Sequence, residues 1–194
     1  RAGVHPLSSL LMLKQTEAKA RGEVIGIASV TADTGTATRS LNKYDHRYIA
    51  ADPTDVEDYA SLSITFTDGT KAQVNASDLL LGGTRGFIEA YSSDGVLYGK
   101  ISPVDIVKSY YLDEDGLEDV ELSEMLLTKT GWNNPFVADE TIRGFLGELQ
   151  DFVECIQTGR EPISNFALAR DTMKVVYAAY QSAEEGRRIE FGQS

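Results

Sequence analysis

Two stretches with helical periodicity fill the last quarter of the chain. In the first, apolar residues recur at i, i+3, i+4 and i+7 along one helix face: Ile142, Phe145, Leu146, Leu149, Phe152, Val153 and Ile156. The second carries a comparable stripe: Phe166, Ala169, Met173, Val176, Tyr177, Tyr180 and Ala183. Gly159 and Pro162 end the first helix. Ser164 or Asn165 can cap the second, which ends at Gly186. The pair predicts an apolar helical layer that packs on a sheet.

The middle of the chain alternates apolar and polar residues in the way typical of strands. Leu62, Ile64 and Phe66 alternate with Ser and Thr, and the following Asp68-Gly69 predicts a hairpin turn. Other strands are predicted at residues 24–31, 72–74, 85–91, 96–101, 106–112, 121–128 and 189–191. An apolar helix is predicted at 7–13, a long loop at 32–58, a solvated acidic connection at 113–121 and a crossover at 129–135.

Consecutive hairpins followed by long helices predict an α+β fold. We expect an open, mainly antiparallel sheet with helices covering one face, within a single domain that spans residues 1–194. The other face is expected to include Ala90, Val96, Tyr98 and Tyr110. A face so apolar and aromatic is typical of a partner surface, so a homo-oligomer through the sheet is predicted.

Composition and charge exclude several classes of protein. The 194 residues carry a formal net charge of −12, which would repel nucleic acid and an anionic membrane surface. No apolar run approaches the roughly 20 residues that span a bilayer, and no signal segment opens the chain. Cys155 is the only cysteine, so no disulfide forms within the chain. We expect a cytoplasmic protein without nucleic-acid or membrane partners.

Few residues offer catalytic chemistry. No glycine fingerprint, phosphate loop or zinc motif is present, and two histidines with one cysteine make a metal site improbable. His5 is the candidate acid or base, although a histidine near a helix start is also commonly a cap or a core group. Trp132 and Asn133 suit a sugar pocket, although a lone Trp also anchors loops on a core. Arg85 and Lys100 could reach a substrate carboxylate, but solvated surface is the simpler interpretation.

Several segments together resemble a known family. They are Ala2 to Leu7, Val56 to Ala60 leading into Phe66 to Thr70, Gly131-Trp132, and a closing run that is the most specific part. The closing run includes Gly144, Gly147, Glu148, Asp151, Phe152, Thr158 to Pro162, Ser164 and Tyr177 to Arg187. In order and spacing they resemble the C-terminal α/β domain of the Gfo/Idh/MocA family of NAD(P)-dependent oxidoreductases.

The resemblance implies a substrate-binding and oligomerisation domain that follows a Rossmann domain absent from these residues. NAD or NADP would bind the full-length protein, no cofactor would bind this domain alone, and the isolated domain should be inactive. His5 matches a family histidine that assists proton transfer at a sugar or polyol hydroxyl. The family often has an aspartate four residues earlier, where this chain has Arg1. Two alternatives stay open: a stand-alone assembly or binding module without chemistry, and the domain of an NAD-dependent glycosidase.

Overall fold

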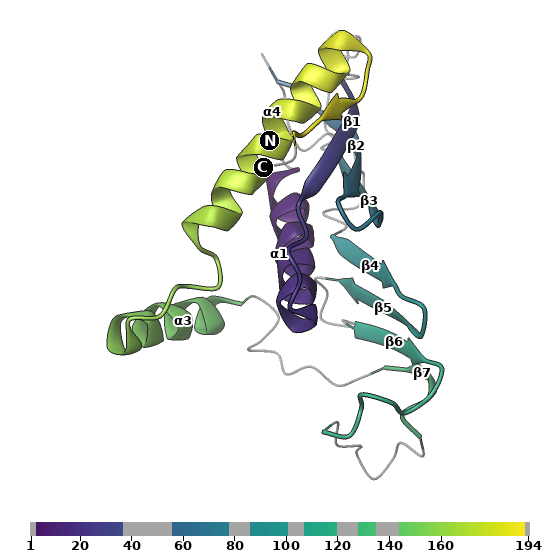
Figure 1. The fold of residues 1–194 in the computed structure, drawn as a ribbon, viewed down its shortest axis with the longest axis vertical. Helices are drawn as coiled ribbons and strands as arrows, with labels where there is room; N and C mark the ends of the chain where they lie inside the picture. Colours follow the sequence, from purple (N-terminus) through teal and green to yellow (C-terminus); the bar gives the residue numbers. More distant parts are fainter. Residues whose placement is uncertain are drawn as a thin grey trace, which may run out of the picture. The chain divides into compact units, whose positions relative to one another are not determined.

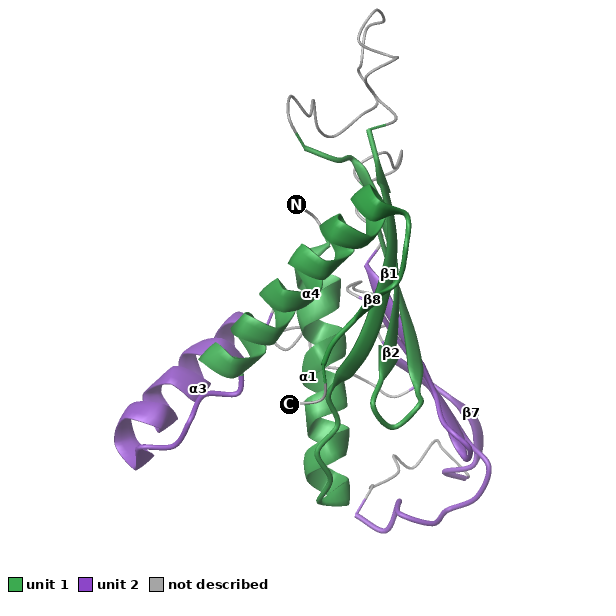
Figure 2. Cartoon of the chain, turned by 45° about the horizontal axis from the view of Figure 1, so that its top comes forward, with its two compact units in different colours: residues 1–84, 164–194 green, residues 85–163 purple. Residues whose placement is uncertain are grey.

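The computed structural model describes residues 3–36, 56–77, 86–100, 107–119, 128–134 and 144–192. The chain divides into two compact units, one of residues 1–84 and 164–194 and the other of residues 85–163 (Figure 2). The helices are α1 (Val4–Arg21), α3 (Phe145–Thr158) and α4 (Phe166–Glu185) (Figure 1). The strands are β1 (Ile27–Gly35), β2 (Tyr59–Phe66), β3 (Lys71–Ser77), β4 (Phe87–Tyr91), β5 (Gly95–Lys100), β6 (Val107–Tyr111), β7 (Gly131–Asn133) and β8 (Ile189–Glu190).

The first unit is a four-stranded antiparallel sheet covered on one face by α1 and α4. Its strand order is β3-β2-β1-β8. The register pairs Val30 with Ile64 and Leu62 with Val74, so the apolar residues of neighbouring strands share one face. This face and the two helices form the core, in which Leu7, Val30, Ile64 and Val175 are at most 1% exposed.

The opposite face of this sheet is polar. Alternation along β2 and β3 places Ser61, Ser63, Thr65, Gln73 and Asn75 on it, and the Ser61 hydroxyl donates to Asn75 Oδ1 at 2.8 Å. Hydroxyl and amide groups are compatible with water, so this face needs no cover.

The second unit contains an antiparallel sheet of order β4-β5-β6-β7. Its tight β4–β5 turn is closed by Ser92, whose backbone N–H donates to the Gly95 carbonyl at 2.9 Å and whose hydroxyl donates to Asp94 Oδ1 at 2.6 Å. Helix α3 also belongs to this unit. None of its residues is buried, and Phe145, Leu149, Phe152 and Ile156 are each more than 60% exposed.

The α+β class and the antiparallel pairing are confirmed. The hairpin around Asp68-Gly69 forms between β2 and β3, and Asn165 caps α4 by accepting from the Leu168 N–H at 2.9 Å. Gly186 ends α4 with φ of 64°, a left-handed conformation that glycine adopts without steric cost. The strands form two four-stranded sheets, a division that alternation alone does not reveal.

Several sequence-based predictions are wrong. The predicted loop 32–58 begins too early, because β1 continues to Gly35, and the predicted crossover contains β7. Ala90 pairs with Leu97 and therefore lies on the face opposite to Val96, Tyr98 and Tyr110. His46, Arg85 and residues 121–127 of the predicted strand at 121–128 lie outside the described residues, as does Arg1.

The buried stripe of α4 also differs from the prediction. The residues that pack inward are Leu168, Thr172, Val175, Ala178, Ala179 and Ser182. The predicted stripe is largely exposed, with Phe166 at 86% and Tyr177 at 69%. Small and β-branched side chains allow the helix to approach β1 closely, whereas the large aromatic residues do not fit there.

Candidate functional site

His5 lies in the first turn of α1. The helix begins after Gly3, and no side chain caps its N-terminus. The His5 carbonyl accepts hydrogen bonds from the hydroxyls of Ser8 and Ser9, both at 3.0 Å. Successive helix residues are about 100° apart, so His5 is on the opposite side of α1 from the buried Leu7. The imidazole is therefore exposed and directed away from the core of its unit.

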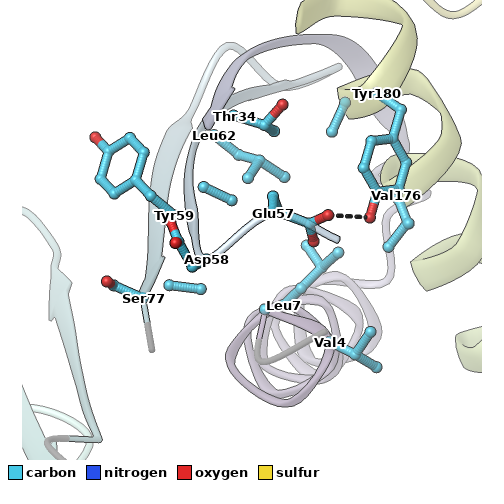
Figure 3. A pocket seen from close by; sticks show the side chains of 14 residues that line it. Val4, Leu7, Thr34, Glu57, Asp58, Tyr59, Leu62, Ser77, Val176 and Tyr180 are labelled. Carbon is cyan, nitrogen blue, oxygen red and sulfur yellow. Dashed lines mark hydrogen bonds between the residues drawn. The ribbon is translucent and has the colours of Figure 1, made fainter. Parts of the chain in front are cut away.

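A small pocket adjoins this first turn (Figure 3). Its volume is about 60 Å³, and its walls include Val4, Leu7, Thr34, Glu57, Leu62, Val176 and Tyr180. Pockets that enclose small-molecule ligands usually measure roughly 300 Å³ or more. This pocket can hold a few water molecules and is too small for a sugar.

Glu57 and Tyr180 form a hydrogen bond across this pocket (Figure 3). The Tyr180 hydroxyl donates to Glu57 Oε2 at 2.9 Å, and the pair joins the segment before β2 to α4. Partial burial raises the pKa of Tyr180, and the hydrogen bond to the Glu57 carboxylate raises it further. Tyr180 therefore remains a protonated donor at neutral pH. No local sequence pattern indicates this pair, because the two residues are 123 positions apart.

Trp132 and Asn133 are neighbours on β7 and therefore point to opposite faces of its sheet. Trp132 is 61% exposed, and its ring centroid lies 5.4 Å from that of Tyr110. The Asn133 side-chain amide donates to the backbone carbonyls of Lys129 and Gly131, at 3.0 and 3.3 Å. The amide N–H groups of Asn133 thus bind the backbone of the segment just before β7. The structure does not bring the two residues together on one surface.

Trp132 lies on one face of the β4-β5-β6-β7 sheet, together with other aromatic and charged residues. Alternation of apolar and polar residues along the sequence indicates only some of them. The strand register places Phe87, Glu89 and Tyr91 of β4 on the same face as Val96, Tyr98, Lys100, Lys108, Tyr110 and Trp132. We call this set the aromatic face. Phe87 stacks on Tyr98 with ring centroids 5.8 Å apart, and Lys108 Nζ lies 5.9 Å from the Trp132 ring centroid. Phe87, Tyr91 and Trp132 are each at least 60% exposed.

Metal ligation and membrane insertion find no support in the described ranges. No group of three or more His, Cys, Asp or Glu side chains there is arranged to hold a metal ion. None of the three helices α1, α3 and α4 combines the length and apolar character that crossing a bilayer requires.

Several solved structures share this fold. An aldose-aldose oxidoreductase from Caulobacter crescentus, complexed with glycerol, matches 97% of this chain with a TM-score of 0.65 and 17% identity. GenD2 from gentamicin A biosynthesis, in complex with NAD, matches 87% with a TM-score of 0.56 and 23% identity. The WlbA dehydrogenase from Bordetella pertussis, in complex with NADH and UDP-GlcNAcA, matches 87% with a TM-score of 0.52 and 16% identity.

These three matches cover only 46%, 42% and 41% of the respective structures, so the chain spans less than half the length of the proteins it resembles. At these identities the likeness establishes the fold alone. No curated protein sequence matches the chain significantly.

The sequence itself carries the family assignment. Residues 22–191 match the model of the oxidoreductase family, C-terminal α/β domain, and this match runs through both compact units. The chain therefore belongs to the Gfo/Idh/MocA family, as its C-terminal domain. His5 precedes the matched residues, so the family match does not assign its role.

Proposed function

We propose that this chain is the substrate-side domain of an NAD(P)-dependent oxidoreductase that acts on a sugar or polyol hydroxyl. The observation that carries the proposal is the family match over residues 22–191. Sugar-related oxidoreductases among the structural neighbours, with NAD or NADH bound in two of them, support the substrate class and the cofactor.

His5 is the acid or base of this proposal. Imidazole exchanges a proton near neutral pH, as removal of a hydroxyl proton requires. NAD(P), held by a preceding domain, would accept or supply the hydride. The position of His5 on the exposed side of α1 is consistent with this role, because the imidazole can contact a substrate held outside the unit. The side chains around the small pocket would instead pack against the first turn of α1 and hold it in place.

Trp132 is a further candidate for sugar contact, because its ring is exposed and a flat indole can stack on a pyranose. Asn133 is a weaker candidate, because its amide hydrogens already bind the loop carbonyls. We also propose that the protein is cytoplasmic and forms a homo-oligomer through the uncovered face of a sheet.

Turnover by the full-length protein tests the proposal. The protein would be mixed with NAD⁺ or NADP⁺ and a panel of aldoses, polyols and nucleotide sugars, and reduced nicotinamide would be followed by its absorbance. We expect cofactor-dependent oxidation of at least one sugar by the full-length protein and none by residues 1–194 alone. A full-length protein that neither binds nor reduces either cofactor would contradict the proposal.

A further inference from the structure

The helix turn that carries His5 has no side-chain cap. Gly3 is its N-cap residue and has no side chain, and the Leu7 N–H closes the turn by donating to the Gly3 carbonyl at 3.1 Å. Pro6 lies within the turn and has no N–H to donate. The position of this first turn therefore depends on the residues against which it packs.

The first turn packs against the walls of the small pocket (Figure 3). Val4 and Leu7 line the pocket from α1, and Leu7 is only 1% exposed. A pocket of about 60 Å³ leaves little free space, so the turn can shift only where the walls around it shift. His5 directly follows Val4, and any such shift would therefore carry the imidazole with it.

The bond between Glu57 and Tyr180 joins two of these walls. The segment that carries Glu57 is bound to the end of β1, because the Asp58 N–H donates to the Gly35 carbonyl at 3.0 Å. The Tyr180 hydroxyl donates to Glu57 Oε2 at 2.9 Å and so connects this segment to α4. Strand β1, the segment before β2 and helix α4 are thus linked beside the first turn of α1, within one compact unit.

We propose that Glu57 and Tyr180 are positioning residues for His5, because their hydrogen bond fixes the pocket wall against which the first turn of α1 packs. The inference rests on the proposed function, in which His5 exchanges a proton with a substrate hydroxyl. Proton transfer requires hydrogen-bond distance, and a misplacement of about 1 Å can cost roughly 100-fold in rate. The pocket is too small for a sugar, so the pair does not bind the substrate itself. Loss of the bond should therefore lower kcat and leave KM nearly unchanged.

Steady-state kinetics of full-length variants test this inference. Tyr180→Phe and Glu57→Met each remove the hydrogen bond, whereas Glu57→Gln keeps an acceptor for the Tyr180 hydroxyl. Tyr177→Phe is the matched control, because it removes a hydroxyl from the same helix at a residue that is 69% exposed. At a temperature well below every unfolding midpoint, we expect the first two variants to lose at least about fivefold in kcat. Glu57→Gln should keep most of the original kcat, and Tyr177→Phe should match it.

A double-variant cycle with His5→Asn separates positioning from a general loss of stability. If the pair acts through His5, Tyr180→Phe should change the kcat of His5→Asn by less than about twofold, since no imidazole is left to misplace. Hydrogen exchange of the full-length protein gives a readout that does not depend on turnover. Tyr180→Phe should speed exchange of the backbone amides in the first turn of α1 and leave those near Arg21 unchanged.

The possible failures of this inference and of the proposed function are distinct. A loss of kcat by the same factor with and without His5 would overturn the inference alone, because the pair would then act on the fold and not through the imidazole. Unchanged hydrogen exchange in the first turn would also overturn it, whether or not the protein oxidises a sugar. A full-length protein that neither binds nor reduces either cofactor would overturn the proposed function and, with it, the positioning role.

Discussion

Lys14 on α1 and Asp68 in the β2–β3 turn form a salt bridge, with Lys14 Nζ 2.7 Å from Asp68 Oδ2. Lys14 is only 8% exposed, also binds Glu17 at 2.7 Å and lies over the Phe66 ring. Thr70 donates to Asp68 through both its hydroxyl and its backbone N–H. The salt bridge therefore fixes the middle of the helix that begins with His5 to the end of the hairpin.

This salt bridge predicts an acid-sensitive contribution to stability. Burial alone would raise the pKa of Asp68, but the hydrogen bonds from Lys14 and Thr70 outweigh it and hold the pKa at about 2. A depressed folded pKa gives stability that is present above the unfolded pKa of about 3.9 and is lost as pH falls towards 2. Allowing for solvent screening, we expect ionised Asp68 to contribute about 1–2 kcal/mol to the free energy of unfolding.

Urea unfolding of the original protein and of Asp68→Asn measures this contribution. The difference in unfolding free energy should be full at about pH 6 and should shrink as pH falls from about 4 to 2. Asp119→Asn, at an exposed position, is the control and should change stability by less than about 0.5 kcal/mol. A difference for Asp68→Asn that is independent of pH would contradict the assignment.

Asn165 should stabilise α4 as its N-cap. Its Oδ1 accepts from the Leu168 N–H at 2.9 Å, which satisfies one of the free N–H groups of the first turn. Asn165→Ala should lower the unfolding free energy by about 1 kcal/mol, whereas Asn165→Asp should retain most of it. Urea unfolding followed by circular dichroism measures both variants. Equal losses of unfolding free energy would show that the N-cap hydrogen bond does not account for the effect of Asn165.

Two glycines should respond in opposite directions to alanine. A Cβ on Gly95 would lie 3.1 Å from the Tyr110 carbonyl oxygen and 3.2 Å from the Tyr111 ring, so β5 and β6 would have to separate. We expect a loss of about 1 kcal/mol. Gly147 lies within α3, where a Cβ would meet no other atom within 4 Å, and alanine there should stabilise the helix by about 0.5–1 kcal/mol.

The fluorescence of Trp132, the only tryptophan, reports on the sheet that contains Gly95 and is the measurement for that variant. For Gly147→Ala, the measurement is thermal unfolding followed by far-UV circular dichroism, which reports the helix content of the whole chain. A Gly95→Ala protein as stable as the original would mean that the strands absorb the extra methyl group without cost.

The Tyr180 hydroxyl should contribute to the stability of the fold. Tyr180→Phe removes the donor to Glu57 and should cost about 1 kcal/mol. Tyr177→Phe removes a hydroxyl from a side chain that is 69% exposed, and should cost less than about 0.5 kcal/mol. The thermal unfolding midpoints of the two variants would be compared with that of the original protein. Equal shifts in the two variants would contradict a specific role for the Glu57–Tyr180 bond.

The elements of this fold follow from local patterns, whereas their packing does not. Alternation and turn residues are local, so the Asp68-Gly69 hairpin could be predicted, and so could the helix ends at Gly159 and Gly186. The inward side of α4 depends on how closely the helix approaches β1. Periodicity alone therefore favours the larger aromatic residues, whereas Val175 and Ala179 are the ones that pack inward.

The candidate site shows the same division. His5 could be selected from the sequence because few residue types exchange protons near neutral pH. The Glu57–Tyr180 bond could not, because it joins residues 123 positions apart. The aromatic face was only partly predictable, since Tyr98 and Tyr110 share it by cross-strand register and Ala90 does not.

The pH dependence of turnover by the full-length protein and its His5→Asn variant tests whether His5 is the catalytic acid or base. If His5 carries the proton, the variant should bind NAD(P) as before and lose about 100-fold or more in kcat, together with the limb of the pH profile that reports imidazole ionisation. A variant with unchanged kcat and an unchanged pH profile would contradict the role of His5 in this family member.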